Sequence, residues 1–529
     1  DLLQETAAKY PGRPCARFFG KQYSYSRINN WADRCAAGLQ KMGVQPGDKV
    51  ILLLPNSHPF IIAYYGILKA GAVVVPINPL SSSHELSFFI DNSGAETVIT
   101  IPLFAKKASA LQQQAAFKRL VVAPLSNFLP FPLSWLQGLQ EWRLMQGVPA
   151  AGLYDFMKLL RRALPSGFQP QPADPGDLAI ILYSGGTTGA ARAIMLSHFN
   201  CVANACQLKA WGDLNPDQRV LSVLPLFHGF GMSLTMNVPI LVGGEIILHP
   251  RFNVRDILAS IQKDRPNFFV GVPTMFVAFI NTPGLERFDL TSLQGVFVGG
   301  APLTQAVKDG FESKTGGRMI EGYGLTEAVT AIMGNPLQGL HKPGSIGLPF
   351  SDVEAKIVDL QDGRDLSPNE SGEILLRSPT LMMGYYHNQE ETGKAIVDGW
   401  LHTGDIGHMD EDGYFYITDR KKELIITGGF NVFPREIHEV LYQHPKVKEG
   451  VAIGLPDPYL GERIKVFAVL KEGETATPEE LIAFFKERLI YYKVPAEIEF
   501  RQELPKSMIG KILPRVLQEE EAQKARNAG

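Results

Sequence analysis

Apolar strand-like runs alternate with amphipathic helical segments along this chain, and this alternation constrains the fold more than any other feature. The expected strands are Lys49–Leu54, Val73–Val75, Glu96–Ile99, Arg219–Leu224, Glu245–Leu248, Asn267–Val272, Gly295–Val298 and Arg318–Glu321. The expected helices are Phe60–Lys69, His84–Asp91, Val254–Lys263, Thr274–Phe279 and Leu303–Lys314. Such alternation is typical of mostly parallel sheets covered by helices, so we expect an α/β fold.

The pattern changes near Gly344, where short β runs and turns such as Asp362-Gly363 predict hairpins. The charge run Asp419–Glu423 between two expected strands is either a solvated turn or a domain boundary. A smaller α/β region follows, with expected helices and strands near Arg435–Tyr442, Val451–Ile453, Ile464–Leu470 and Pro478–Arg488. We therefore expect a large N-terminal domain (1–420) with a β-rich subdomain, and a small mobile α/β C-terminal domain (421–529).

Composition excludes several classes of protein. A chain of 529 residues is too long for one ordinary core, and its net charge of −3 offers no footprint for nucleic acid. The four cysteines, Cys15, Cys35, Cys201 and Cys206, have neither metal-site spacing nor disulfide density, which indicates a reducing cytoplasm. We expect Cys201 and Cys206 to be buried on one helix.

The sequence gives little sign of a membrane segment. Residues 1–5 lack the features of a signal peptide, although the chain does not begin with Met, which leaves room for an upstream piece. Prolines interrupt the apolar segment Val50–Ile77, so it reads as strand, helix and strand. Phe156–Leu164 is short, basic and amphipathic; it is either a solvated surface helix or a weak contact with an anionic membrane.

A loop of glycines and hydroxyls follows the apolar run Leu178–Leu182. The loop residues are Ser184, Gly185, Gly186, Thr187, Thr188 and Gly189. Glycine lets backbone N–H groups converge, and the hydroxyls add donors, so the loop suits a phosphate. It lacks the Gly-Lys-Ser/Thr ending of a Walker A loop, and Ala193–Leu196 reads as a second strand before a helix capped by Ser197. A tight hairpin without a ligand is the alternative.

Two further motifs, Gly299-Gly300-Ala301-Pro302 and Glu321-Gly322-Tyr323-Gly324-Leu325-Thr326-Glu327, follow expected strands, and ligands gather at strand ends in such folds. Trp400-Leu401-His402-Thr403-Gly404-Asp405 offers a carboxylate in a tight turn, and Lys511 lies in Ser507–Pro514, an expected exposed loop near the C-terminus. Together they offer a flat ring, carboxylates for Mg²⁺ and ribose, and a mobile cation. These are the parts that a nucleotide site needs.

In this order the motifs resemble those of the adenylate-forming superfamily of acyl-CoA synthetases, adenylation domains and firefly luciferases. The resemblance runs from about Tyr23 to Arg515 and includes Asp419–Lys422 and Gly428–Val432. Pro225–Met232 and Gly271–Thr274 are most similar to bacterial long-chain fatty acyl-CoA ligases.

The resemblance implies roles for individual residues. The loop from Ser184 to Gly189 would bind the β- and γ-phosphates of ATP, Thr326 the α-phosphate, and Glu327 a Mg²⁺ ion. Tyr323 would stack on adenine, and Asp405 would hold the ribose, aided by Arg420. The other residues implied in nucleotide binding are Arg192, Gly300, Ala301, Pro302, Glu321, Gly322, Gly324 and Ile417.

The resemblance also implies a two-step reaction. Lys511 would bridge the acyl carboxylate and the α-phosphate, and Lys422 matches a hinge position. Gly428 and Gly429 would line a tunnel for coenzyme A, while His228 and Val298 would lie near the acyl pocket. Each residue has a plainer alternative: Tyr323 and His228 as core residues, Glu327 at a favourable helix end, Asp405 in an Asx turn and Lys511 on the surface.

One position departs from the family pattern. The phosphate loop usually continues Pro-Lys-Gly, whereas here it reads Ala191-Arg192-Ala193, and Gly185 stands where Ser or Thr is common. Arg192 keeps the positive charge but is a planar fork instead of a point charge. We therefore hypothesise that the enzyme also works readily in reverse, making ATP from acyl-CoA, AMP and pyrophosphate.

The sequence thus predicts an AMP-forming fatty acyl-CoA synthetase that uses ATP, Mg²⁺ and coenzyme A. An aryl- or short-acid CoA ligase, a luciferase-like oxygenase and a decayed nucleotide-binding relative remain alternatives. The expected partners are small molecules, without nucleic acid.

Overall fold

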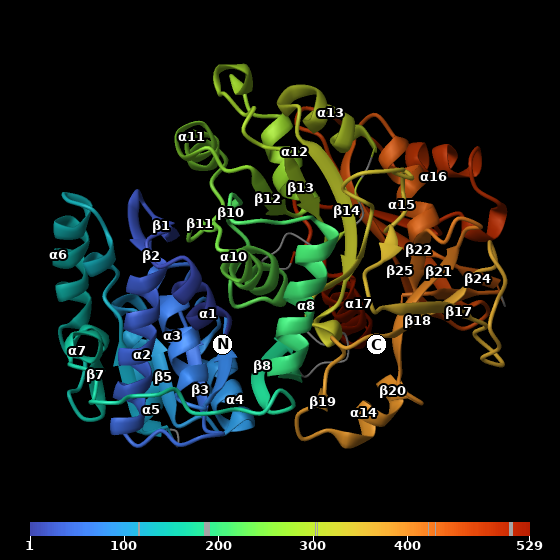
Figure 1. Ribbon diagram of the computed structural model, residues 1–529. Coiled ribbons are helices and arrows are strands. Elements are labelled where there is room, and N and C mark those ends of the chain that lie inside the picture. Colours follow the sequence, from blue (N-terminus) through green and yellow to red (C-terminus); the bar gives the residue numbers. More distant parts are fainter. Residues whose placement is uncertain are drawn as a thin grey trace. The chain divides into compact units, whose positions relative to one another are not determined.

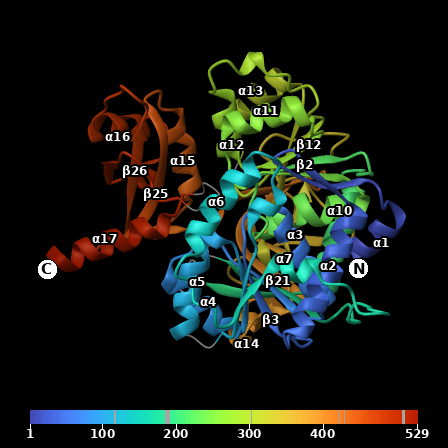
Figure 2. The same cartoon turned by 90° about the vertical axis from the view of Figure 1, so that its left-hand side faces the viewer.

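The computed structural model describes residues 1–114, 117–184, 191–301, 303, 305–421, 423–428, 430–506 and 512–528 (Figures 1 and 2). The chain divides into two compact units. Unit 1 comprises residues 1–354 and 377–396, and unit 2 comprises residues 355–376 and 397–529. The expected domain boundary near residue 420 stays a prediction.

Unit 1 contains an eight-stranded sheet in the order β19-β9-β8-β4-β3-β5-β6-β7. Its strands are β3 (Lys49–Leu53), β4 (Val73–Pro76), β5 (Thr97–Thr100), β6 (Arg119–Val122), β7 (Leu153–Asp155), β8 (Leu178–Ser184), β9 (Arg192–Ser197) and β19 (Gly384–Tyr385). The strands from β8 to β7 pair in parallel, and β9 and β19 add antiparallel pairs at one edge. β3, β4 and β5 are apolar because both faces of a parallel sheet are covered.

Helices cover this sheet on both faces. The helices of this part of the chain are α1 (Leu2–Lys9), α2 (Tyr25–Lys41), α3 (His58–Lys69), α4 (Ser83–Ser93), α5 (Pro102–Gln114), α6 (Leu133–Met145) and α7 (Phe156–Arg161). Buried side chains of α4 and α5 join those of β3–β6 in one apolar cluster. α3 packs on β3 and β4, and α2 packs on α3.

The second sheet of unit 1 has nine strands in the order β16-β15-β14-β13-β12-β10-β11-β1-β2. They are β1 (Pro14–Phe18), β2 (Lys21–Ser24), β10 (Arg219–Ser222), β11 (Glu245–Leu248), β12 (Phe268–Gly271), β13 (Gly295–Val298), β14 (Arg318–Gly324), β15 (Ala331–Gly334) and β16 (Leu348–Pro349). The run from β1 to β14 is parallel, and β2, β15 and β16 are antiparallel.

The remaining helices of unit 1 lie between or beside these strands. They are α8 (His198–Trp211), α9 (Gly229–Met232), α10 (Val238–Val242), α11 (Val254–Asp264), α12 (Pro273–Ile280), α13 (Gln305–Thr315) and α14 (Gln389–Ala395). Aromatic rings join α12 and α13 to the sheet, with Phe276 centred 5.2 Å from Phe269 and 5.1 Å from Phe311. The expected parallel α/β fold is confirmed.

Unit 2 contains two five-stranded sheets. The first comprises β17 (Glu354–Val358), β18 (Gly372–Arg377), β20 (Ile396–Val397), β21 (Trp400–Met409) and β22 (Phe415–Arg420). The second comprises β23 (Ile425–Thr427), β24 (Phe430–Val432), β25 (Val447–Asp457), β26 (Gly461–Leu470) and β27 (Glu497–Phe500). Its helices are α15 (Pro434–Gln443), α16 (Pro478–Lys486) and α17 (Pro514–Ala528).

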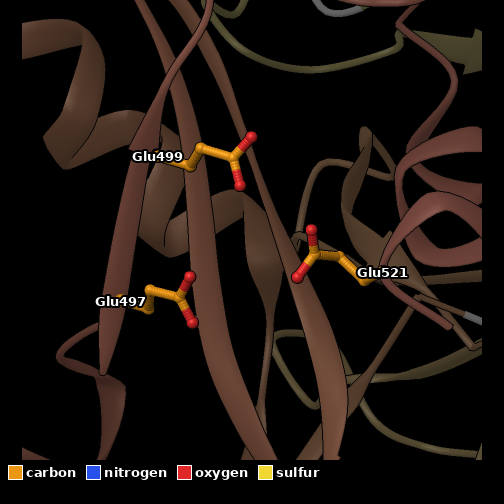
Figure 3. A group of neighbouring side chains, drawn as sticks. All are labelled: Glu497, Glu499 and Glu521. Carbon is orange, nitrogen blue, oxygen red and sulfur yellow. The ribbon is translucent and has the colours of Figure 1, made fainter. Parts of the chain in front are cut away.

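A buried lysine ties α17 to the second sheet of unit 2. Lys465 on β26 is 2% exposed, and its Nζ lies 2.6 Å from Glu497, 2.8 Å from Glu499 and 2.8 Å from Glu521. Figure 3 shows the three carboxylates, two from β27 and one from α17, pointing toward one another. Lys465 lies between the carboxylates, and Arg463, Arg501 and Lys524 also pair with them, so side chains of the protein supply their counter-charge.

Three expectations from the sequence differ from the structure in extent or burial. Asp419 and Arg420 belong to β22, so the charge run is not simply a turn. Cys201 is buried on α8 as expected, but Cys206 on the same helix is exposed. The expected strand at Val451–Ile453 is the middle of the much longer β25.

The expected helix over Phe156–Leu164 is the shorter α7, which ends at Arg161. Its apolar residues Phe156, Leu159 and Leu160 are buried, which favours a helix packed on the protein over a membrane contact through that face. No helix of the described residues has both the length and the apolar character required to cross a bilayer.

Candidate active site

The glycine-rich loop joins two antiparallel strands, as the sequence predicts. Ser184 ends β8 and pairs in register with Arg192, the first residue of β9. Gly185, Gly186, Thr187, Thr188 and Gly189 lie outside the described residues. Ser197 caps α8 by accepting a hydrogen bond from the backbone N–H of Asn200, 3.1 Å away.

Two neighbouring parallel strands end at a second part of the site. Val298, the last residue of β13, pairs with Glu321 of β14, so Gly299–Ala301 and Gly322–Gly324 continue from adjacent positions. The backbone N–H of Leu303 donates to Glu321 Oε1 at 3.2 Å, which ties the loop to β14. Pro302 lies outside the described residues.

The glycines of β14 allow close backbone packing. A Cβ on Gly322 would lie 2.0 Å from the ring of Phe297, and one on Gly324 would lie 2.0 Å from the carbonyl oxygen of Thr330. Tyr323 stands between them and is 8% exposed. Only glycine fits on both sides of this tyrosine, so its backbone is fixed by packing.

Glu327 lies on the short helix that follows β14, at residues Thr326–Ala328. Its Oε1 accepts a hydrogen bond of 2.9 Å from the hydroxyl of Tyr385, and its backbone carbonyl accepts one from Met382. No described residue donates to Oε2 of Glu327. A half-buried carboxylate with one oriented oxygen and one without a donor suits a hard cation such as Mg²⁺.

Arg192 connects the exit of the glycine-rich loop to Glu327 through Tyr385. Its Nη1 lies 3.3 Å from the Tyr385 hydroxyl, and its Nη2 pairs with Glu391 Oε2 at 2.9 Å. Its guanidinium also lies over the Tyr385 ring, 5.1 Å from the centroid. Burial and then the neighbouring Glu327 carboxylate raise the pKa of Tyr385, so its hydroxyl stays protonated and can donate.

Sequence reasoning missed Tyr385 and Glu391. Both are far from Arg192 in the chain, and β19 brings them near because it pairs with β9, with Tyr385 opposite Ile194. Gly384-Tyr385-Tyr386 carries no pattern that separates one tyrosine from the other. Only the strand pairing identifies which tyrosine reaches the site.

His228 caps the four-residue helix α9. Its Nδ1 accepts a hydrogen bond of 3.2 Å from the backbone N–H of Phe230, and burial lowers the pKa of the imidazole, so the neutral ring is favoured. A Cβ on the next residue, Gly229, would lie 2.3 Å from the carbonyl oxygen of Val329. The helix therefore lies against the segment that follows Glu327, although His228 already has a structural partner.

In unit 2, Asp405 and Arg420 pair across two strands. They are opposite each other on β21 and β22, and Arg420 Nε lies 2.9 Å from Asp405 Oδ1. Asp405 is only 3% exposed. Ile417 pairs with Gly407 on the same two strands. The arrangement holds a carboxylate and a guanidinium together at one place on this sheet.

Glu373 is a second carboxylate at this place that the sequence did not indicate. It accepts hydrogen bonds from Lys421 Nζ at 3.0 Å and from the backbone N–H of Gly404 at 3.1 Å. Its Oε2 also lies 3.3 Å from Nδ1 of His402. Glu373 thus fixes the turn that precedes Asp405.

The residues expected to act in the second step are only partly described. Gly428 has a φ of +57°, and its N–H donates to the Leu460 carbonyl at 2.8 Å. Gly429, Lys422 and Lys511 lie outside the described residues. On either side of residues 507–511, Lys506 and Ile512 form a β bridge, and the Leu513 N–H donates to the Pro505 carbonyl.

Comparison with known proteins identifies the family. The model described as AMP-binding enzyme matches residues 3–386, and the model described as AMP-binding enzyme C-terminal domain matches residues 436–511. A long-chain-fatty-acid–CoA ligase of Bacillus subtilis is 40% identical over 99% of this chain and 94% of its own length. The ligase of the same name from Escherichia coli O157:H7 is 36% identical over 100% and 95%.

Solved structures agree with this result. ATP-bound MatB from Rhodopseudomonas palustris superposes with a TM-score of 0.86 at 27% identity, over 98% of each chain. The chain belongs to the AMP-binding enzyme family. The expected adenylate-forming class is therefore confirmed, and with it the expectation of an AMP-forming acid–thiol ligase.

Proposed function

We propose that this protein activates a long-chain fatty acid with ATP to an acyl-adenylate and then transfers the acyl group to coenzyme A. The observation that carries the proposal is the chain of contacts from Arg192 through Tyr385 to Glu327. It joins the end of the glycine-rich loop to the carboxylate proposed for Mg²⁺. The whole-length similarity to two long-chain-fatty-acid–CoA ligases supports the choice of substrate.

The first step needs cations and donors, because it sets an anionic carboxylate against an anionic triphosphate. We assign the loop from Ser184 to Gly189 to the outer phosphates and Thr326 to the α-phosphate. Glu327 would hold a Mg²⁺ ion, which when bound offsets the negative charge of the phosphates. Lys511 would join the carboxylate to the α-phosphate.

The nucleoside would be held by residues at the ends of strands. Tyr323 would stack on adenine, framed by Gly300, Ala301 and Pro302, and its backbone is already fixed by tight packing. Asp405 would accept hydrogen bonds from the ribose hydroxyls, and Arg420, which contacts its Oδ1, would hold it in place. Both of these residues belong to unit 2, so the proposal requires that the two units serve one substrate.

In the second step a thiol attacks the acyl-adenylate and releases AMP. We propose that rotation about Lys422 withdraws Lys511 and presents Gly428 and Gly429 to the pantetheine arm. Closure during the first step would keep water from the reactive anhydride.

The acid substrate could carry either a long aliphatic chain or an aryl group. A feruloyl-CoA synthase of Amycolatopsis sp. is 33% identical over 95% of both chains, so an aryl acid is the second candidate. Pyrophosphate exchange with aliphatic acids of graded length and with aryl acids distinguishes them. We expect the long aliphatic acids to give the highest kcat/KM; a preference for aryl or short acids would contradict the proposal. ATP binding without any exchange would indicate a decayed site.

The same proposal includes the reverse reaction, in which Arg192 would favour the use of pyrophosphate, and a cytoplasmic location. The reverse reaction is supported only by the replacement of the usual lysine by Arg192. A cytoplasmic location is supported by the four free cysteines, of which Cys35 and Cys201 have their pKa raised to about 12 by burial.

A further inference from the structure

Helix α6 exposes a row of large apolar side chains. We call this the α6 surface, and it comprises Phe131 just before the helix together with Leu133, Trp135, Leu136, Leu139 and Trp142. Phe131 is 83% exposed, and the exposed fractions of Trp135 and Trp142 are 60% and 64%. In Figure 1 α6 forms the outer edge of unit 1, and in Figure 2 it lies at the front. Contiguous exposure of this kind marks an interaction site.

The polarity of α6 is reversed relative to an ordinary surface helix. Its one buried residue, among the thirteen that the structure describes for this helix, is Glu141. The Glu141 carboxylate accepts hydrogen bonds from the backbone N–H of Leu125 at 2.8 Å and from the hydroxyl of Ser126 at 2.5 Å. A surface helix normally packs its apolar face inward. This helix is instead held to the protein by the Glu141 carboxylate and, at its end, by Met145, which packs against the core, while the side chains of the α6 surface face outward.

The charges around α6 are positive. Residues 101–154 contain one acidic residue, the buried Glu141, against Lys106, Lys107, Lys118, Arg119 and Arg143. Lys118 and Arg119 pair with Glu96. Lys106 on α5, which packs against α6, and Arg143 on α6 are exposed, and within the described part of the chain neither has an acidic partner. An apolar surface with tryptophans and unpaired cations complements an anionic lipid surface, because indole rings favour the headgroup region and basic groups pair with phosphates.

We propose that the α6 surface is a peripheral binding site for anionic phospholipid bilayers. Trp135 and Trp142 enter the headgroup region, and Arg143 and Lys106 contact lipid phosphates. The surface does not depend on the proposed function. If that function is right, binding through the α6 surface also places the enzyme at the bilayer, in which a long-chain fatty acid dissolves. The basic helix α7, whose apolar side chains are buried, does not provide this contact.

The test measures binding of the full chain to vesicles made of equal parts phosphatidylcholine and phosphatidylglycerol. Co-sedimentation gives the bound fraction, and a blue shift of tryptophan emission reports burial of the rings. We expect the triple variant Trp135→Gln, Leu136→Gln, Trp142→Gln to bind at least about tenfold more weakly. The matched control is the double variant Phe199→Gln, Val202→Gln on α8, whose side chains are 50% and 39% exposed. The control is expected to bind as the wild type does.

Several outcomes would overturn the proposal. Wild-type protein that does not bind these vesicles would do so, as would a triple variant that binds equally well. If the protein binds pure phosphatidylcholine vesicles equally well, and added salt does not weaken the binding, then Lys106 and Arg143 do not contribute to it. A wild-type dimer that the triple variant dissociates, without vesicle binding, would assign the surface to a second copy. Pyrophosphate exchange with a water-soluble acid should be the same in all variants, which separates this test from that of the proposed function.

Discussion

At the scale of single residues, Tyr385 links the loop exit to the carboxylate proposed for Mg²⁺. Its hydroxyl donates to Glu327 and receives a contact from Arg192, which is in turn fixed by Glu391. Arg192 reaches Tyr385 and Glu391 with two separate nitrogens while its planar guanidinium lies over the Tyr385 ring, whereas a lysine would offer a single ammonium without this stacking. Arg192, which replaces the usual lysine of the loop, therefore helps to position Glu327 through Tyr385.

Replacing Tyr385 with Phe tests this link. The variant keeps the buried ring but loses the hydrogen bond to Glu327, which is worth about 1 kcal/mol. We expect the Mg²⁺ concentration for half-maximal pyrophosphate exchange to rise about threefold to tenfold, with little change in Tm. Calorimetric titration of ATP with and without Mg²⁺ gives a second readout that does not depend on turnover.

Two further variants complete the residue-scale test. Tyr386→Phe is the matched control, and it should leave the Mg²⁺ dependence unchanged; an equal shift in both tyrosine variants would contradict a positioning role. Arg192→Lys should shift the Mg²⁺ dependence in the same direction as Tyr385→Phe. If Arg192→Lys leaves the ratio of saturating forward and reverse rates unchanged, the proposal that Arg192 favours the reverse reaction is wrong.

At the scale of elements, α17 is held by an ion cluster in addition to its buried apolar residue Leu517. Burial by itself lowers the pKa of Lys465, but its hydrogen bonds to Glu497, Glu499 and Glu521 outweigh burial and raise it. Burial raises the pKa of Glu499, but its contacts with Lys465, Arg501 and Lys524 outweigh burial and lower it to about 2. Removing the buried Lys465 leaves the three carboxylates without the cation between them, which destabilises the docking of α17.

The cluster makes the docking of α17 sensitive to acid. A carboxyl group whose pKa is lower in the folded than in the unfolded state stabilises the fold above its unfolded pKa, here near 4.5. That stability is lost as pH falls from 4.5 toward 2, and for a partly exposed group it amounts to about 1–3 kcal/mol. We expect hydrogen exchange of α17, corrected for intrinsic rates, to accelerate over this range.

The variant Lys465→Met should increase the hydrogen exchange of α17 already at neutral pH. Lys486→Met, on the exposed face of α16, is the control and should not; equal protection of α17 in both variants would contradict the docking role.

How well the sequence predicts an element depends on where its free energy comes from. β3, β4 and β13 were predicted almost to the residue, because strands buried on both faces are continuous apolar runs. α6 could not be oriented from sequence, since a buried Glu141 and exposed tryptophans reverse the usual pattern. Tyr385 and Glu391 were missed because the pairing of β19 with β9 is a long-range contact.

At the scale of the whole molecule, the proposed residues fall into two groups that follow the two compact units. Arg192, Glu327 and Tyr323 belong to unit 1, while Asp405, Arg420 and Gly428 belong to unit 2. The family match at residues 3–386 covers most of unit 1 together with residues 355–376 of unit 2, and the match at residues 436–511 lies within unit 2. The two steps of the reaction act on the same carbonyl carbon but need different protein groups beside it. A chain with two units can bring up one set of groups for each step by rotating one unit, so that both sets need not occupy the site together.

The two half-reactions therefore should respond differently to the loss of Lys511. Lys511→Ala removes the cation proposed to stabilise charge during adenylation, so pyrophosphate exchange should fall about 100-fold or more. Thioester formation from supplied acyl-adenylate and coenzyme A should be nearly unaffected, because the lysine is proposed to be withdrawn in that step. Lys486→Ala, an exposed lysine of unit 2, is the matched control and should leave both rates unchanged. Equal loss of both half-reactions in Lys511→Ala would show that one arrangement of the units serves both steps, and the rotation about Lys422 would have to be abandoned.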